Sequence, residues 1–318
     1  MLNKELLKSL CQISGLVYKP SSFFNENYCK KQFPTNCSSF KYLNKQPLFI
    51  ESNIDCQCYV SIFNKDSILC AFRGTENTRD WLTDANMIRV RMDLKDIEGD
   101  NRPRAHWGIL RQFRSVEKNI TDYIEEEIKN KDIKNIVYTG HSLGGALATI
   151  AAQNFGHKYP TLNHMCVTFG APRCGDDDFR KKFNKVCCFS KRFVNEYDPV
   201  PSLPFSLRYS HVCPSQQIKT NQLIDMETPI SRFFWIMWYK FTNIFWSNYN
   251  PVDDHGITQY EAFDLFNSFK ECTEELIDEL ITVKNSVSST NSGCVDLILN
   301  LYSPGSRFSG RIPFIKEV

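Results

Sequence analysis

The sequence lacks several features that would place it in other classes of protein. No run reaches the roughly 18 consecutive apolar residues that a membrane-spanning helix needs. The 318 residues carry a net charge of only +2, which gives no electrostatic reason to expect nucleic acid or acidic partners. The N-terminal segment contains Lys4, Glu5 and Lys8 and no unbroken apolar core. It does not resemble a signal peptide, so we expect a cytoplasmic protein.

Metal-binding cysteine pairs are also missing. None of the 13 cysteines stands in a C-x-x-C pair, so no zinc site and no other metal is expected. An odd number of cysteines without a signal peptide favours a reducing compartment over a disulfide framework. Six of them lie in strand-like runs and are expected to act as small hydrophobic residues: Cys56, Cys58, Cys70, Cys166, Cys187 and Cys188.

The overall composition is ordinary for a soluble globular protein. Hydrophobic residues make up 42% of the chain and charged residues 23%. Segments typical of strands alternate with segments typical of helices, which predicts an α/β fold with a mostly parallel central sheet flanked by helices. We expect one domain over residues 1–270, followed by a C-terminal extension over 271–318 with a helix, a Ser/Asn-rich linker and a short apolar segment.

The predicted elements follow in a simple order. Strands are expected at Cys56–Phe63, Ser67–Phe72, Ile136–Thr139, His164–Phe169, Cys187–Val194 and, less regularly, Arg208–Cys213. Helices are expected at Leu2–Tyr18 and Arg104–Lys131, after Ser142, after Asp176, and at Ile257–Phe269. The segment Ser21–Pro47 is polar and aromatic without a clear period and is interpreted as an irregular surface excursion.

The most informative stretch runs from Ile136 to Ile150. A β-branched and aromatic run leads into Gly140-His-Ser-Leu-Gly144, and apolar residues at helical spacing follow. A G-x-S-x-G sequence between a strand and a helix is typical of a nucleophile elbow, in which Ser142 adopts a strained conformation and its hydroxyl is exposed above the sheet. The alternative is a plain Gly/Ser turn, but the flanking strand and helix favour the elbow.

A serine nucleophile requires donors for the oxyanion of its tetrahedral intermediate. The backbone N–H of Leu143, directly after the serine, is one candidate. Thr75 is the other, because Phe72-Arg-Gly-Thr75 ends a strand and offers both an N–H and a hydroxyl at the carboxyl edge of the sheet. From the local sequence alone, an ordinary turn at the end of a strand fits the segment around Thr75 equally well.

The serine also requires a base and a carboxylate that orients the base. Asp198 directly follows a strong strand and is held by Pro199 and Pro201, which makes it the favoured acid. His211 and His255 both remain as bases, and His255 is preferred because its loop could fold over the active edge. His106, at the start of a helix, is interpreted as a structural hydrogen-bonding residue.

Several of these motifs together resemble the class 3 lipase family, which includes fungal triacylglycerol lipases. The resemblance rests on Phe72–Thr75, Trp81–Asp84, His106–Gly108, Gly140–Gly145, Phe169–Arg173 and Asp198–Pro204, completed by Asp254, His255 and Tyr260. It implies an α/β-hydrolase in which Ser142 is the nucleophile, Asp198 the acid and His255 the base, with Thr75 and Leu143 as oxyanion donors. His211 matches a structural position of the family.

The resemblance further implies a serine lipase that hydrolyses ester bonds of acylglycerols through an acyl-serine, with no cofactor. Phospholipase or general carboxylesterase activity is the alternative, and a non-catalytic lipid-binding scaffold is a second one. Residues 76–87 would form a lid anchored by Trp81, whose alternative role is that of a core residue. Residues 21–47, the aromatic insert at 231–250 and the last fifty residues depart from the family pattern.

The aromatic insert contains the most apolar part of the chain, Ser231 to Trp246. It is too short and too polar to span a bilayer. It could be a packed helix over the sheet or the acyl cleft. Alternatively, Trp235, Trp238 and Trp246 could contact a membrane or lipid droplet peripherally, because tryptophan is favoured at the headgroup level.

Overall fold

The structure is a computed structural model that describes residues 4–18, 48–54, 56–63, 66–75, 88–94, 97, 102–195, 198–204, 206–218, 223–224 and 255–257. Several predictions fall on other residues. The lid with Trp81, the insert with Trp235, Trp238 and Trp246, most of the predicted helix at 257–269 and the extension at 271–318 all lie outside the described part. The division of the chain into 1–270 and 271–318 therefore stays a prediction.

A single eight-stranded sheet forms the centre, in the order β1-β2-β3-β6-β7-β8-β9-β10. Its strands are β1 (Leu48–Glu51), β2 (Gln57–Phe63), β3 (Ser67–Phe72), β6 (Asn135–His141), β7 (Asn163–Phe169), β8 (Cys187–Val194), β9 (Ser215–Gln217) and β10 (Leu223–Ile224). The run from β3 to β9 is parallel, whereas β1 and β2 at one edge and β10 at the other pair antiparallel with their neighbours. The strands predicted at 56–63 and 67–72, which pair here as a hairpin, and the mostly parallel sheet are confirmed.

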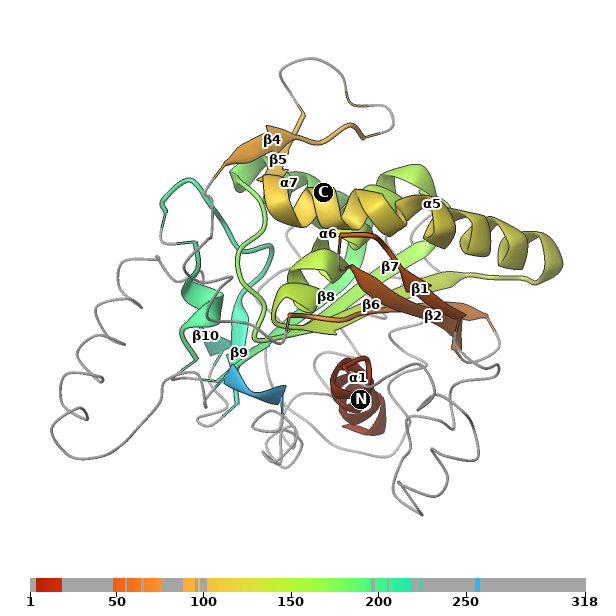
Figure 1. Ribbon diagram of the computed structural model, residues 1–318, viewed down its shortest axis with the longest axis horizontal. Coiled ribbons are helices and arrows are strands. Elements are labelled where there is room, and N and C mark those ends of the chain that lie inside the picture. The colour runs from red at the N-terminus through yellow and green to blue at the C-terminus, as the bar shows by residue number, and fades with distance from the viewer. Residues whose placement is uncertain are drawn as a thin grey trace, which may run out of the picture.

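Helices cover both faces of this sheet (Figure 1). The face opposite α1 (Lys4–Leu16) carries α5 (Trp107–Asn130), α6 (Leu143–Lys158) and α7 (Asp177–Val186). Side chains alternate along each central strand: Tyr138 packs with the core under α5 and α6, and its neighbour Val137 packs with the core under α1. β6 is buried along its whole length, as central parallel strands are.

The connections place the ends of several segments at one edge of the sheet. α5 precedes β6 and α6 follows it, and β6 pairs in parallel with both β3 and β7. The carboxyl ends of β3, β6, β7 and β8 therefore lie at the same edge, together with the first turns of α5 and α6. That edge is where an open α/β sheet binds its ligands.

Three predictions about local structure are wrong. The helix expected from Arg104 begins at Trp107, because residues Arg104–His106 form β5 and pair with β4 (Arg89–Arg91) in a small separate hairpin. The strand expected at Arg208–Cys213 is absent, because only Ser210 makes a bridge there, to Gly175. The third is the assignment of Cys188 to the apolar interior. Cys187 is buried, whereas Cys188, which lies at a register shift between β7 and β8, is exposed and disulfide-bonded.

The remaining cysteines in the described part behave as predicted from their strand positions. Cys56, Cys58, Cys70, Cys166 and Cys187 are free thiols in the core. Burial raises the pKa of each of the last four, so these thiols are neutral and chemically inert at physiological pH. A free thiol of this kind contributes like a small apolar side chain.

His164, at the start of β7, gives the fold a dependence on pH. Its Nε2 lies 2.9 Å from the carbonyl oxygen of Tyr159, and its Nδ1 lies 3.0 Å from the hydroxyl of Tyr138. Burial, opposed by the Tyr159 carbonyl and aided by the neighbouring His157, lowers the pKa of His164 from 6.5 to about 4. The folded chain therefore binds this proton less tightly than the unfolded chain does.

We expect His164 to destabilise the fold in acid. The stability that the neutral, buried ring contributes is fully present above pH 6.5. It is lost as the pH falls towards about 4, since the unfolded state gains the proton first. The free energy of unfolding should drop by about 3 kcal/mol across this interval from this residue. Urea titrations at several pH values, compared with His164→Gln, test the expectation. A wild-type curve with the same pH slope as the variant would contradict it.

Candidate active site

The turn between β6 and α6 holds Ser142 in a rare backbone conformation. Its φ of 57° and ψ of −130° make it the one non-glycine residue with positive φ in the described part of the chain. Two hydrogen bonds hold this conformation: the Ser142 N–H donates to Phe169 O at 2.9 Å, and the Gly145 N–H donates to Ser142 O at 2.9 Å. A strained residue held in this way between a strand and a helix is the geometry of a nucleophile elbow.

Glycine is required on both sides of the serine because the backbones pass so closely. A Cβ on Gly140 would lie 2.4 Å from the backbone of Gly144. A Cβ on Gly144 would lie 2.2 Å from the carbonyl oxygen of Phe72 and 2.9 Å from the nitrogen of Gly74. Contacts that short do not occur, so the two glycines allow the turn to form and to pack against the end of β3.

Asp198 and His255 form a buried hydrogen-bonded pair. His255 Nδ1 lies 2.8 Å from Asp198 Oδ2, and the other carboxylate oxygen accepts the N–H of Val200 at 2.9 Å. Asp198 is completely buried, and the short 3₁₀ helix Val200–Ser202 follows it directly. Since a carboxylate only accepts, Nδ1 of His255 carries the proton, and Nε2 of the neutral ring is left as an acceptor.

The hydroxyl oxygen of Ser142 and Nε2 of His255 are both buried. Within the described residues, neither Ser142 Oγ nor His255 Nε2 has a hydrogen-bond partner, although both atoms are inaccessible to solvent. Ser142 is 1% exposed and His255 is 3% exposed. Buried polar atoms are normally paired, and the exceptions are frequently groups kept available for a reaction.

His141 connects the serine turn to His255. It directly precedes Ser142, and its ring lies 4.6 Å from the ring of His255. Its Nε2 lies 2.7 Å from the carbonyl oxygen of His255, to which it can only donate. Burial first, and then the neighbouring His255, hold the pKa of His141 well below its usual value, so the ring is neutral and Nδ1 is unprotonated.

Tyr18 completes this chain from the end of α1. Its hydroxyl lies 3.0 Å from Nδ1 of His141 and must donate to it, because that nitrogen carries no proton. The order Tyr18, His141, His255 therefore fixes the backbone of His255 through two hydrogen bonds. Neither Tyr18 nor His141 was predicted from the sequence. Tyr18 stands at the end of an amphipathic helix and carries no motif, and His141 was considered only as part of the glycine-flanked turn.

We expect Tyr18→Phe to lower kcat for ester hydrolysis about fivefold with little change in KM. The variant removes one neutral hydrogen bond, worth about 1 kcal/mol, that positions His255 without contacting the substrate. Steady-state kinetics on a soluble ester, with thermal unfolding measured in parallel, provides the test. A loss that appears only in KM, or no loss at all, would exclude Tyr18 as a positioning residue.

The two predicted oxyanion donors come from adjacent segments. Leu143 is the first residue of α6, so its N–H belongs to the helix N-terminus, which has no intrahelical acceptor for its first donors. Thr75 follows Gly74, and Gly74 packs directly against Gly144 of the elbow. Both residues therefore lie beside Ser142 at the carboxyl edge, which is consistent with the donor role predicted for each of them.

The other candidate histidines have structural surroundings. His106 is the N-cap of α5 and accepts the N–H of Ile109 at 3.4 Å. His211 Nε2 lies 2.8 Å from the carbonyl oxygen of Pro201 and so helps to hold the loop that carries Asp198. Of the two bases left open by the sequence, the structure therefore pairs His255, and not His211, with the carboxylate.

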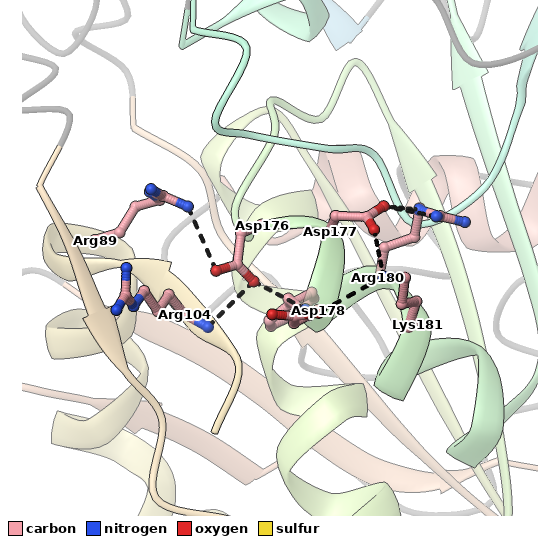
Figure 2. A network of polar contacts seen from close by, with 8 residues as sticks. Arg89, Arg104, Asp176, Asp177, Asp178, Arg180 and Lys181 are labelled. Atoms are coloured by element: carbon pink, nitrogen blue, oxygen red, sulfur yellow. Dashed lines mark hydrogen bonds and ion pairs between the residues drawn. The ribbon is translucent and has the colours of Figure 1, made fainter. Parts of the chain in front are cut away.

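Asp176 is the N-cap of α7 and begins an acidic run, Asp176–Asp178. Asp176 accepts the N–H of Phe179 at 2.9 Å and the N–H of Arg104 at 3.2 Å (Figure 2). Asp177 is bonded to Arg180 and Lys181, and hydrogen bonds from Lys181 and then Arg180 lower its pKa. The structure thus keeps this cluster outside the candidate active site. No group of three metal-ligating side chains occurs within the described residues.

The parallel sheet, the strained serine turn and the Asp–His pair together define an α/β-hydrolase fold. Residues 69–207 match the family model described as lipase (class 3). Through this segment, the chain is similar to the class 3 lipase family.

Individual relatives agree with this assignment. The chain is 30% identical over 174 residues to a secreted mono- and diacylglycerol lipase A from Penicillium cyclopium, which covers 54% of each chain. It is 27% identical over 157 residues to the chloroplastic phospholipase A(1) DAD1 of Arabidopsis thaliana, with 46% of this chain and 35% of that protein covered. The chain thus spans about half the length, or less, of these relatives.

A solved structure supports the fold. The triacylglyceride lipase of Rhizomucor miehei superposes with a TM-score of 0.56 at 22% identity, covering 70% of this chain and 83% of that one. The predicted α/β-hydrolase fold and family resemblance are confirmed, whereas the predicted lid and extension lie outside the described residues.

Proposed function

We propose that this protein is a serine hydrolase that cleaves carboxylic ester bonds of acylglycerols through an acyl-serine intermediate. The observation that supports the proposal is the buried Asp198–His255 pair, whose histidine ring lies 4.6 Å from the ring of His141, the residue before Ser142. Ser142 Oγ and His255 Nε2 are both buried without partners among the described residues. Acyl transfer of this kind requires a nucleophile, a base and a carboxylate that orients the base. The class 3 family and its acylglycerol-cleaving relative support the substrate class.

In the proposed reaction, Ser142 Oγ attacks the ester carbonyl carbon while His255 Nε2 takes the hydroxyl proton. The carbonyl oxygen becomes an oxyanion, stabilised by donors from Leu143 and Thr75, and Asp198 stabilises the imidazolium. The C–O bond of the ester breaks, and His255 gives its proton to the leaving alcohol. Water then attacks the acyl-serine, His255 again takes and returns one proton, and the fatty acid and free Ser142 are released.

Phospholipid is the second candidate substrate. The observation that favours it is the similarity to a plant phospholipase A(1), which belongs to the same set of relatives. Both substrates present an acyl ester of glycerol, and the proposed reaction at Ser142 is identical for them. The choice between them depends on the polar group at the third glycerol position and not on the chemistry of the serine.

A substrate panel tests the proposal. Purified full-length protein is supplied with a soluble short-chain ester, an emulsified diacylglycerol and a phosphatidylcholine of the same acyl chain, and released fatty acid is titrated. We expect release from the soluble ester and the diacylglycerol, with less from phosphatidylcholine. Equal or faster release from phosphatidylcholine would move the assignment to a phospholipase. A folded protein that releases no acid from any ester would leave a lipid-binding scaffold as the function.

Three further predictions stay proposals. Trp81 would anchor a lid over the acyl cleft, and Trp235, Trp238 and Trp246 would contact a membrane or lipid droplet. The chain would act in the cytoplasm, although the Penicillium relative is named as secreted and Cys188 is disulfide-bonded. None of the helices in the described residues is long and apolar enough to cross a membrane.

A further inference from the structure

Three exposed apolar side chains lie on segments that are far apart in sequence. Ile88 is 50% exposed, Trp107 is 41% exposed and Leu207 is 73% exposed. Single exposed apolar residues are common and need no explanation, but apolar residues gathered at one place mark a surface that binds something. These three account for most of the large apolar side chains that the described part exposes to solvent.

Direct contacts tie the three segments together. The Trp107 N–H donates to the carbonyl oxygen of Ile88 at 2.9 Å, and the Tyr209 hydroxyl donates to the same oxygen at 3.4 Å. Arg89 Nη1 donates to the carbonyl oxygen of Arg208 at 2.9 Å. The segment before β4, the start of α5 and the loop at 206–209 therefore form one continuous surface. We call Ile88, Trp107 and Leu207, with the arginines described next, the Trp107 patch.

The patch is rich in arginine. Arg104, Arg111 and Arg208 are exposed, and Arg111 lies over the ring of Trp107 at 5.4 Å. Among the described residues, no carboxylate lies within ion-pair distance of these three guanidinium groups. Arg91 is also exposed and stands directly opposite Arg104 across the β4–β5 hairpin.

Among the described residues, the nearby acids are engaged by other groups. Figure 2 shows Asp176 engaged with the side chain of Arg89 and the backbone of Arg104, whose guanidinium points away from it. Asp177 and Asp178 pair with Arg180 and Lys181 on α7. A net charge of +2 for the whole chain therefore conceals a local concentration of positive charge.

The Trp107 patch lies at the same edge of the sheet as Ser142. Trp107 begins α5, which runs towards the amino end of β6, so the first turn of α5 is at the carboxyl edge. Leu207 follows the loop of Asp198, which leaves the carboxyl end of β8. A surface that holds this edge against a lipid layer would bring lipid esters to the serine.

We propose that the Trp107 patch docks the protein onto lipid surfaces that carry anionic phosphate headgroups. Apolar side chains enter the headgroup region, tryptophan is favoured there, and exposed arginines bind the phosphates. The docking does not depend on turnover, whereas its use in presenting substrate rests on the proposed function.

Vesicle binding tests the docking separately from catalysis. Full-length Ser142→Ala protein is co-sedimented with vesicles of phosphatidylcholine and with vesicles of an equal mixture of phosphatidylcholine and phosphatidylglycerol. We expect tighter binding to the mixed vesicles, and weaker binding as salt is raised from roughly 0.1 M to roughly 1 M. Trp107→Ser with Leu207→Ser should weaken this binding by about tenfold or more. Arg104→Gln and Arg208→Gln should each weaken it by about fivefold.

Ile128→Ser provides the matched control. Ile128 is also a partly exposed apolar residue of α5, but it lies at the opposite end, about 30 Å from Trp107 along the helix axis. Its replacement should leave vesicle binding unchanged. The same patch variants are also made in protein that keeps Ser142, for activity assays. They should hydrolyse a monomeric soluble ester as fast as the unsubstituted protein does. Their activity should fall only on mixed vesicles.

Three results would overturn the docking surface. The first is unchanged vesicle binding by the folded patch variants. The second is equal binding to neutral and mixed vesicles. The third is a dimer, detected by sedimentation velocity, that the Trp107→Ser and Leu207→Ser changes dissociate, because the patch would then be covered by a second copy. A protein that binds vesicles through the patch but hydrolyses no ester would refute the proposed function and leave the docking intact.

Discussion

Replacing Ser142 with alanine is expected to lower kcat for ester hydrolysis by about 10⁵-fold to 10⁶-fold, with little change in KM. The variant keeps the elbow, the Asp198–His255 pair and both candidate oxyanion donors, and removes only the atom that forms the acyl-enzyme bond. Water would have to replace the hydroxyl, without the placement that the strained turn gives to Oγ. The residual rate should come from binding and oxyanion stabilisation alone.

Two measurements make this result interpretable. Thermal unfolding and near-ultraviolet circular dichroism should match the wild type, because a lost hydroxyl leaves packing nearly unchanged. Ser115→Ala, an exposed serine of α5, controls for the substitution itself. If Ser142→Ala retained more than a tenth of the wild-type kcat while Ser115→Ala retained all of it, the hydrolysis would take place elsewhere on the chain.

Asp198→Asn is expected to lower kcat by about 10⁴-fold through the wrong histidine tautomer. The asparagine can still accept the N–H of Val200, so its NH₂ group faces Nδ1 of His255. Nδ1 must then be unprotonated to accept that hydrogen bond, and the proton moves to Nε2. A ring with its proton on Nε2 cannot take the proton of Ser142.

Asp177→Asn is the matched control for Asp198→Asn. Asp177 also stands near the start of a helix. It is half-exposed, and its carboxylate pairs with Arg180 and Lys181 instead of a histidine. Its replacement should leave kcat unchanged. A loss below tenfold for Asp198→Asn, measured on protein that unfolds at the wild-type temperature, would contradict the assignment of Asp198 as the orienting acid.

The sequence predicted those parts of the site whose backbone geometry leaves little choice of residue. The G-x-S-x-G turn could be recognised because Gly140 and Gly144 approach other backbones within 2.4 Å if given a Cβ, so no other residue fits. Asp198 could be recognised because prolines follow it directly. The elements β6, α6 and β7 could be recognised by their apolar residues, because they are buried along almost their whole length.

The missed features depend on contacts between segments distant in sequence. Tyr18 and His141 are 123 residues apart, and nothing in either neighbourhood reports their hydrogen bond. The hairpin of β4 and β5 consists of two strands of three residues, too short to show alternation. Arg208–Cys213 has the composition of a strand. Its only β-bridge among the described residues joins Ser210 to Gly175, which is too little to form a strand.

The Trp107 patch illustrates the same limit for charge. Composition reports the sum over the chain, in which 38 basic residues nearly balance 36 acidic ones. Folding separates them: Asp177 and Asp178 are paired on α7, while Arg104 and Arg208 are left exposed beside Leu207. A prediction about partners based on net charge alone therefore overlooked a basic surface at the carboxyl edge of the sheet.

Labelling with a fluorophosphonate tests the central claim most directly, because the reagent phosphonylates a serine only when a neighbouring base activates it. The account predicts a single adduct, mapped by mass spectrometry to the peptide containing Ser142, lost in Ser142→Ala and strongly slowed in Asp198→Asn. Labelling at another serine, or none on folded wild-type protein, would contradict it.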